Sequence, residues 1–241
     1  MTVDRSVLLA YLRQKADVGE RSLLLENLNR SEAMAMLREV RAAATVRPAV
    51  AASAARAQNS LQVFQQEAST CTRCRLHETR STVVFGEGNP NADVMVVGEA
   101  PGQEEDKSGR PFVGQGGKLL DLLLMTAGFP RESVYICNTL KCRPPQNRNP
   151  LPDEMEHCSS YLHGQIDAVA PRALIAVGKF AAQALLNSEE SIGRLRGQVH
   201  SYRGIPLVVT YHPAYILRSP QQGRVAWQDF QLLRQVLDEQ A

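Results

Sequence analysis

DVMVVGEAPG, residues 93–102, is the stretch that decides the fold, because an apolar run here ends in glycine and passes into a Gly/Pro loop. A short apolar run bounded by such turn residues is typical of a strand that is buried on both faces. Three similar runs follow along the chain. We therefore predict four strands, at Asp93–Gly98, Val134–Leu140, Ala173–Val177 and Leu207–Tyr211.

Helical patterns separate and follow these runs. They cover Gly116–Ala127, Asp153–Val169, a segment that ends at Leu186, and a last segment from about Gly223 to Gln240. Strands that alternate with helices predict an α/β fold, in which helices cover both faces of an open parallel sheet. Ligands of such sheets bind beyond the carboxyl ends of the strands. The residues that follow each strand are therefore the candidates for a functional site.

Length and composition place the rest of the chain. Its 241 residues are 44% hydrophobic and 22% charged, which is the composition of an ordinary globular protein. We predict a helical arm and an Ala-rich linker in residues 1–60, and the main domain in residues 61–241. No apolar run is long enough to span a membrane, and charged residues interrupt the N-terminal segment. These features predict a cytoplasmic protein that does not enter a membrane.

The cysteines are spaced as metal ligands. Cys71 and Cys74 form a C-x2-C pair, and Cys142 and Cys158 follow with fifteen residues between them. Thiols stay reduced in the cytoplasm, where spaced cysteines bind metal more often than they pair with each other. Four thiolates can hold zinc or an iron–sulfur cluster, and the spacing does not choose between them. Cys137 lies within a predicted strand, where we expect an inert core cysteine.

The loops after the first strand exclude two nucleotide-binding motifs. The chain contains no G-x4-G-K-[ST] string, and the pattern that begins at Gly114 has Leu119 where G-x-G-x-x-G requires glycine. The acids at 104–106 are expected in a solvated turn. Phe112 lies in a Gly/Pro loop, where it either lines a site or joins a satellite of the core.

Cations gather after the strands although the formal net charge is only +2. Segments 133–152 and 191–228 contain no acid, and their basic residues include Lys141, Arg143, Arg148 and Arg218. Clustered cations among Gly/Pro loops favour a phosphate backbone as the partner. His212 follows the last strand and precedes a proline, a position suited to catalysis, although isolated histidines are more often structural.

Five strings resemble the motifs of the family 4 (iron–sulfur) uracil-DNA glycosylases. They are GEAPG (98–102), GRPFVG (109–114), NTLKCRPP (138–145), NRNP (147–150) and HPAYILR (212–218), and the cysteine spacing is also similar to that family. The resemblance implies a three-layer fold with a central, mostly parallel four-stranded sheet. It also implies one 4Fe–4S cluster of structural role, and removal of uracil from DNA in base excision repair.

The resemblance also assigns residues. It implies uracil binding by Glu99, Ala100, Phe112, Asn138 and His212, and cluster ligation by Cys71, Cys74, Cys142 and Cys158. His212 is the implied catalytic residue that stabilises the departing uracil anion. Ala100 stands where better-known relatives carry a water-polarising aspartate, so Glu99 and Glu105 are the candidates for activating water. Arg143, Arg148 and Arg218 are expected to contact the DNA backbone.

Two other interpretations of the sequence differ from a glycosylase. The chain could be a non-catalytic, metal-containing DNA-binding accessory protein of replication or repair, or a zinc protein of the same fold. An accessory protein would keep the cysteines and arginines without needing Phe112, Asn138 and His212 where they stand. As a glycosylase, the chain is expected to act as a monomer on single- or double-stranded uracil-containing DNA, with a protein partner for its N-terminal arm.

Overall fold

The computed structural model describes residues 56–240 and begins with a helix at 56–69. Residues 56–60 of the predicted linker are therefore helical, and the rest of the predicted N-terminal arm and linker lies outside the described residues. The labelled helices are α3 (Gln103–Ser108), α4 (Gln115–Thr126), α5 (Pro152–Val169), α6 (Lys179–Leu186), α7 (Ile192–Leu195), α8 (Pro213–Arg218) and α9 (Gly223–Asp238). None of these described helices has the length and apolar character that crossing a membrane requires.

The sheet has six strands in the order β1-β3-β2-β4-β6-β5. Its four central strands run parallel and are the four that the sequence predicts: β2 (Val94–Gly98), β3 (Tyr135–Asn138), β4 (Ala173–Val177) and β6 (Ile205–Thr210). The prediction of four strands is wrong at the edges. There, β1 (Glu87–Gly88) and β5 (Val199–Tyr202) add antiparallel pairings. β1 has only two residues, and β5 carries the polar residues His200 and Ser201. Neither strand has the apolar run that marks the four central strands.

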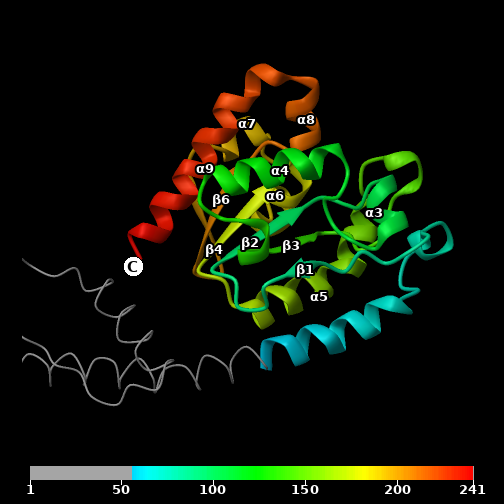
Figure 1. The fold of residues 1–241 in the computed structure, drawn as a ribbon. Helices are drawn as coiled ribbons and strands as arrows, with labels where there is room; N and C mark the ends of the chain where they lie inside the picture. The colour runs from blue at the N-terminus through cyan, green and yellow to red at the C-terminus, as the bar shows by residue number, and fades with distance from the viewer. Residues whose placement is uncertain (1–55, 241) are drawn as a thin grey trace, which may run out of the picture. The chain divides into compact units, whose positions relative to one another are not determined.

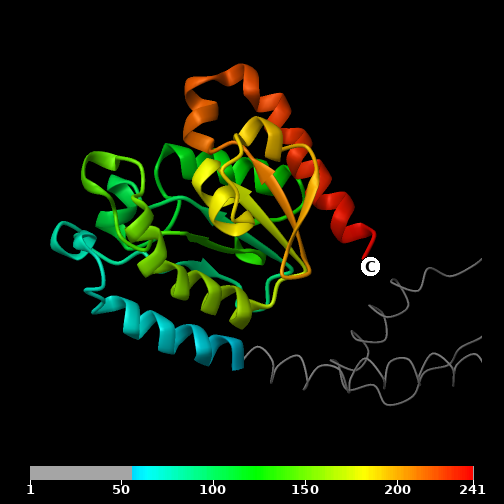
Figure 2. The ribbon, with the colours of Figure 1, turned by 180° about the vertical axis from the view of Figure 1, so that it is seen from behind.

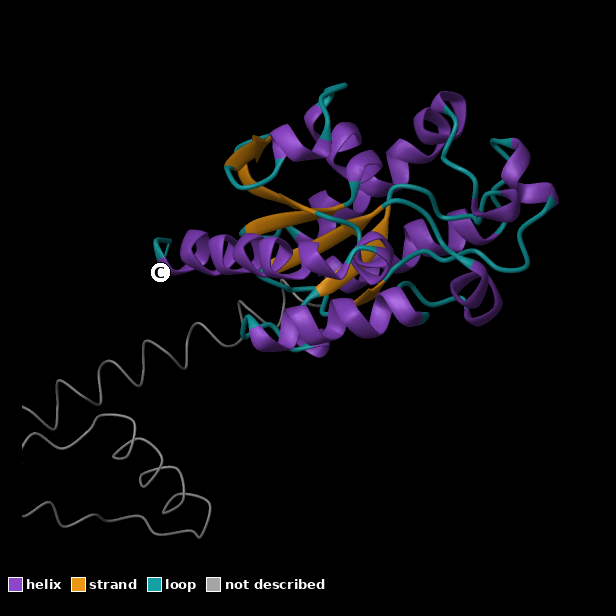
Figure 3. Cartoon of the chain, turned by 90° about the horizontal axis from the view of Figure 1, so that it is seen from above, coloured by secondary structure: helices purple, strands orange, loops and turns teal. Residues whose placement is uncertain are grey.

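Helices cover both faces of this sheet, so the molecule has the expected three layers (Figure 1). Alternate residues of β2 point to opposite faces, and both sets are buried: Met95 and Val97 on one side, Val94 and Val96 on the other. The first side packs against α5 and α6, and the second against α4 and α9. Figure 2 shows the same layers from behind, and Figure 3 shows the strands between helices from above.

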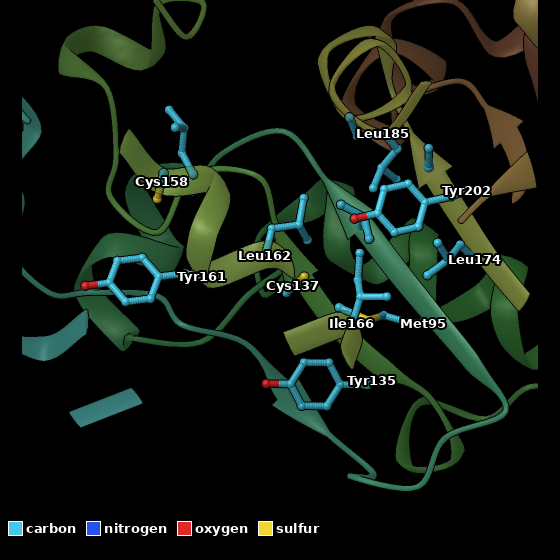
Figure 4. Packing of buried hydrophobic residues seen from close by; sticks show 14 of the residues in the cluster. Met95, Tyr135, Cys137, Cys158, Tyr161, Leu162, Ile166, Leu174, Leu185 and Tyr202 are labelled. Atoms are coloured by element: carbon cyan, nitrogen blue, oxygen red, sulfur yellow. The ribbon is translucent and has the colours of Figure 1, made fainter. Parts of the chain in front are cut away.

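The core on the α5 side extends to the cysteines. Figure 4 shows Cys137 among apolar side chains that include Leu162 and Ile166, with Cys158 farther along α5. Cys137 is fully buried at the centre of β3, which is the environment predicted for an inert core cysteine. The helix at 56–69 packs on the outer side of α5, where the ring of Phe64 lies directly against Gly164.

The contact between Phe64 and Gly164 leaves no room for a side chain. A Cβ atom at Gly164 would lie 2.7–3.0 Å from three atoms of the Phe64 ring. We therefore expect Gly164→Val to lower the free energy of unfolding by about 1–3 kcal/mol through overpacking. Urea unfolding followed by circular dichroism measures this change.

Two comparisons test the cause. Gly193→Val, at a position with nothing within 4 Å of the new Cβ, should stay close to the parent chain. The cost of Gly164→Val should also shrink in a Phe64→Ala background. An undiminished cost in that background would place the strain elsewhere.

Candidate active site

A cavity of about 440 Å³ lies at the carboxyl edge of the parallel strands. Its walls come from the segments that follow β2, β3 and β6, together with the loop before α4 and the start of that helix. The lining includes Glu99, Ala100, Pro101, Gly102, Glu105, Phe112, Asn138, Asn147, Arg148, His212 and Arg218. The fold therefore brings every predicted uracil-binding residue to one cavity.

Asn138 ends β3, lines this cavity and carries an unpaired polar atom. The residue is only 1% exposed, and its Oδ1 atom has no hydrogen-bond partner among the described residues. Its backbone is held, because Lys141 Nζ donates a hydrogen bond to the Asn138 carbonyl over 2.6 Å. A buried acceptor without a partner costs about 1–3 kcal/mol, so this wall of the cavity is complementary to a ligand N–H group.

Phe112 forms the neighbouring wall in a strained conformation. Its φ is +51°, a left-handed region in which an aromatic residue is an outlier. The ring and the Asn138 amide both close over Gly98. A Cβ atom there would lie 2.3 Å from Asn138 Oδ1 and 2.4 Å from Phe112 Cζ. Phe112 is both part of the core and part of the cavity wall, so the two alternatives for it coexist.

Arg131 holds the strained loop from outside the cavity. Its guanidinium donates to two consecutive carbonyls, over 2.6 Å to Pro111 O and 3.2 Å to Phe112 O. Two carboxylates fix the guanidinium in turn, because Glu87 lies 2.9 Å away and Asp121 lies 2.6 Å away. The Arg131 guanidinium is held in place by both carboxylates, so its hydrogen bonds to the loop offset the free-energy cost of the unusual backbone conformation at Phe112.

The acids at 104–106 lie in α3, and the prediction of a solvated turn is wrong for Glu105 and Asp106, although Glu104 is exposed. Glu105 accepts hydrogen bonds from the backbone N–H groups of Gly102, Val113 and Gly114, so its carboxylate ties the loop after β2 to the loop before α4. Asp106 is buried and accepts from the N–H groups of Ser81 and Thr82. The Glu105 and Asp106 carboxylates accept hydrogen bonds from loop N–H groups that have no backbone partner in the described residues. A run of acidic residues in the sequence does not reveal such bonds.

Glu99 differs from Glu105 in its surroundings. Its backbone carbonyl accepts from the Leu140 N–H over 3.0 Å and from the Thr139 hydroxyl, which joins the ends of β2 and β3. Burial raises the pKa of the Glu99 carboxyl above its ordinary value, and its side chain lines the cavity beside Ala100. Unlike Glu105, the Glu99 carboxylate has no network of N–H donors committed to it in the described residues.

His212 is held in one orientation at the start of α8. Its Nδ1 atom accepts from the Ala214 N–H over 3.1 Å, and its ring stacks on Phe112 at 5.9 Å between centroids. Gly178, at the end of β4, closes on the other side, where a Cβ atom would lie 3.2 Å from the imidazole. Burial, helped by the positive charge of Arg218, lowers the pKa of His212 to about 4.

This geometry fixes the tautomer of His212. A neutral imidazole that accepts at Nδ1 carries its proton on Nε2. At neutral pH the side chain therefore offers one N–H donor and no charge.

The three predicted DNA-contacting arginines have different environments. Arg218 is exposed at the rim of the cavity. Arg143 donates through Nε to Asn147 Oδ1 over 2.7 Å. Arg148 forms a two-pronged ion pair with the buried carboxylate of Glu154, at 2.6 and 2.9 Å. The basic surface predicted from acid-free segments is therefore smaller than expected, because Arg148 is neutralised and Lys141 is fully buried.

Several residues that line the cavity have no role predicted from the sequence. Pro144, Asn147 and Asn149 lie on one side of it, and Asn147 takes a left-handed conformation with φ of +55°. The NRNP string contained the signal, because asparagines in a Pro-rich loop are typical of turns and tolerate the left-handed conformation.

The four spaced cysteines lie around a second, smaller cavity, together with Arg80, Lys141 and Tyr161. Two of the sulfurs already accept hydrogen bonds, Cys142 from the Arg80 guanidinium and Cys158 from the Lys141 N–H, each over 3.3 Å. Burial raises the pKa of the Cys74, Cys142 and Cys158 thiols. No three His, Cys, Asp or Glu side chains of the described residues are grouped as ligands of one ion.

Comparison with known proteins identifies the family. Residues 85–231 match the uracil DNA glycosylase superfamily. A type-4 uracil-DNA glycosylase of Archaeoglobus fulgidus is 42% identical over 179 residues, which cover 71% of this chain and 90% of that protein. A type-4 uracil-DNA glycosylase of Thermotoga maritima is 42% identical over 175 residues, or 71% of this chain and 91% of that protein. The chain belongs to the type-4 uracil-DNA glycosylases.

The family match covers the whole active-site cavity. Its span, 85–231, runs from the segment before β1 into α9 and includes every residue named above as lining the cavity. It also includes Cys142 and Cys158 but begins after Cys71 and Cys74. A type-5 uracil-DNA glycosylase of Pyrobaculum aerophilum is less similar, at 33% identity over 63% of this chain and 81% of that protein.

The lowered pKa of His212 predicts how stability depends on pH. Its folded-state pKa, about 4, lies below the ordinary value of 6.5, so the unfolded chain binds this proton more tightly between the two values. The stability contributed by neutral His212 is therefore full above pH 6.5 and lost as the pH falls toward 4. His212→Asn keeps an acceptor for Ala214 and should flatten this dependence. Urea unfolding at pH 7 and at pH 5 gives the change in the free energy of unfolding for each protein. An equal change in both proteins would show that folded His212 is already protonated at pH 5.

Proposed function

We propose that this chain removes uracil from DNA by hydrolysing the N-glycosidic bond after base flipping, which leaves an abasic site for base excision repair. Membership of the type-4 family supports the proposal. The observation on which it rests is the buried, unpaired Oδ1 atom of Asn138, a residue that lines the cavity beside Phe112. A glycosylase must take the base out of the stack, and the cavity must then supply what the stack and the base pair provided.

Asn138 and Phe112 recognise the flipped base. Uracil presents an N3–H donor and an O4 acceptor, which match the carbonyl and the NH2 group of a fixed asparagine side chain. Cytosine presents an acceptor and a donor in the reverse order, so like groups would face each other and remain unpaired. The ring of Phe112 offers a stacking face beside this edge.

His212 assists departure of the base. Cleavage breaks the bond between C1′ and N1, and the electron pair leaves with the uracil as an anion. The Nε2–H group of neutral His212 donates a hydrogen bond to a uracil oxygen on which this charge develops. A fixed donor aimed at a developing charge stabilises the transition state more than the bound substrate.

Water completes the hydrolysis by adding to C1′ and losing a proton. Glu99, whose carboxyl lines the cavity, is our first candidate to hold this water. Glu105 keeps the pocket loops together through its three N–H partners, and it remains the second candidate. Ala100 leaves space next to Glu99 and offers no polar side chain of its own.

Cys71, Cys74, Cys142 and Cys158 would hold one 4Fe–4S cluster. The donor set fits, because all four thiols line one cavity and N–H groups already point at two of the sulfurs. When bound, the cluster cross-links the segment after the helix at 56–69 to α5 and to the segment after β3, and it carries no redox step.

The DNA backbone would lie along the rim of the cavity. Arg218 and Arg143 are the cations suited to phosphates, while Arg148 acts mainly through Glu154. Uracil-containing DNA, single- or double-stranded, is the proposed substrate. We further propose that the enzyme is a cytoplasmic monomer, and that residues 1–60 bind a protein partner.

Asn138→Asp tests the proposal directly. The carboxylate loses the donor to O4, so uracil excision should fall by at least ~100-fold, equivalent to about two lost or opposed hydrogen bonds. Single-turnover excision on matched uracil and cytosine oligonucleotides gives the rates. Asn59→Asp, an exposed change of the same charge on the helix at 56–69, is the control. Parent-like rates on uracil in Asn138→Asp would remove this residue from base recognition.

The cluster ligands are tested by a pair of serine variants. Cys142→Ser should lower the iron content per chain and the absorption near ~400 nm of anaerobically purified protein. Cys137→Ser changes a buried thiol outside the ligand set and should retain the parent iron content. Equal loss of iron from both variants would show that the assigned ligand set is wrong.

A further inference from the structure

Lys141 is a buried cation that neither lines the active-site cavity nor belongs to the assigned cluster ligands. It is among the largest fully buried side chains of the described residues, with 1% of its surface exposed. Its Nζ atom donates to Asn138 O over 2.6 Å and to Gln165 Oε1 over 2.5 Å, and it lies 5.8 Å from the centre of the Phe85 ring. A lysine is seldom buried this completely without a partner of opposite charge.

The described residues supply Lys141 with no carboxylate within ion-pair distance. The partners of its ammonium group are a carbonyl and an amide, both uncharged. Burying an ion costs several kcal/mol unless an opposite charge compensates for it. The four assigned cluster ligands lie nearby instead, because Lys141 lines the same small cavity as Cys71, Cys74, Cys142 and Cys158.

The backbone of Lys141 contacts the sulfur of Cys158. Its N–H group donates to Cys158 Sγ over 3.3 Å, and the next residue along the chain is Cys142. The main chain of Lys141 therefore contacts one assigned cluster ligand, and its side chain contacts the carbonyl of the base-reading Asn138.

We propose that Lys141 is the internal counter-charge of the iron–sulfur cluster and the positioning residue that couples the cluster to Asn138. Four thiolates around a cluster leave a net negative charge, which supplies the compensation that buried Lys141 lacks. The ammonium group in turn fixes the end of β3, so an occupied cluster keeps the Asn138 amide aimed into the cavity. This inference rests on the proposed cluster and the proposed role of Asn138.

Gln165 completes the arrangement and provides the means to test it. Its Nε2 atom donates to Phe85 O and to the Tyr135 hydroxyl, over 2.8 and 3.2 Å, which leaves Oε1 directed at Lys141. Gln165→Glu places a carboxylate against the ammonium group with almost no change in size. Gln165→Met removes the same donor without adding charge, and it is the matched control.

The two readings of Lys141 predict opposite results for Gln165→Glu. If the ammonium group only needs a partner, the new ion pair should preserve the protein and its iron. If Lys141 balances the negative charge of the cluster, the new carboxylate pairs with the ammonium group in place of the cluster. The carboxylate then also repels the negatively charged cluster. The absorption near ~400 nm should then bleach in air about tenfold faster than in Gln165→Met.

Lys141→Met gives the second measurement. We expect at most half the parent iron content per chain, and about a tenfold lower kcat per iron-loaded molecule with little change in KM. The loss in kcat corresponds to roughly one hydrogen bond that no longer positions Asn138. Lys141→Arg keeps the charge and should restore iron retention in part. Circular dichroism identifies any variant that fails to fold, in which case the two Gln165 variants decide.

The outcomes separate this inference from the proposed function. Parent protein without iron would overturn the assigned cofactor. Parent protein with iron, together with Gln165→Glu and Lys141→Met variants that retain and bleach their iron as the parent does, would overturn the counter-charge. Parent kcat in iron-loaded Lys141→Met would overturn the link to Asn138, whether or not iron retention changes.

Discussion

The cavity depends on one close approach, in which the Phe112 ring and the Asn138 amide meet over the Cα atom of Gly98. No side chain fits there, because even a methyl group would lie 2.3 Å from the amide oxygen and 2.4 Å from the ring. Glycine at the end of β2 therefore brings a stacking surface and a polar edge into one compact wall. These are the two features that recognise a single flipped base. A wall of this kind discriminates through shape and unpaired polar atoms, so its geometry must be set before the base arrives.

Several contacts outside the cavity set that geometry. Phe112 has an unfavourable backbone conformation, and Gly117 makes it possible because a Cβ atom there would lie 1.9 Å from the Phe112 carbonyl oxygen. Arg131 then holds this carbonyl and the preceding one, while Glu105 holds the N–H groups of the next two residues. Strain of about 1–3 kcal/mol persists only where the surroundings over-determine a conformation, which these charged groups do on both sides of the loop.

The central strands and the place of the site follow from the sequence, whereas its charged contacts do not. Apolar runs such as Val94–Gly98 mark strands buried on both faces, and parallel strands necessarily present their loops at one edge. The edge strand β1 has two residues and is defined by backbone pairing, which leaves no pattern in the side chains. Glu105, Arg148 and Lys141 look like free charges in the sequence. Their partners are backbone N–H groups, a buried carboxylate and a carbonyl, and only the folded loops bring these together.

Those pairings also decide how the site uses charge. Arg131 and Arg148 are held by carboxylates, and Lys141 lies inside, so Arg218 at the exposed rim is the cation best placed to meet a phosphate. The same positive charge helps to lower the pKa of His212. A bound phosphate would cancel part of that influence and would by itself favour protonation of the imidazole. Burial is the larger cause of the lowered pKa, and a bound base and backbone would exclude more water, so we expect His212 to stay neutral in the proposed complex. In the mechanism proposed here, Arg218 would therefore attract an anionic strand while His212 stays uncharged and acts through a fixed N–H bond.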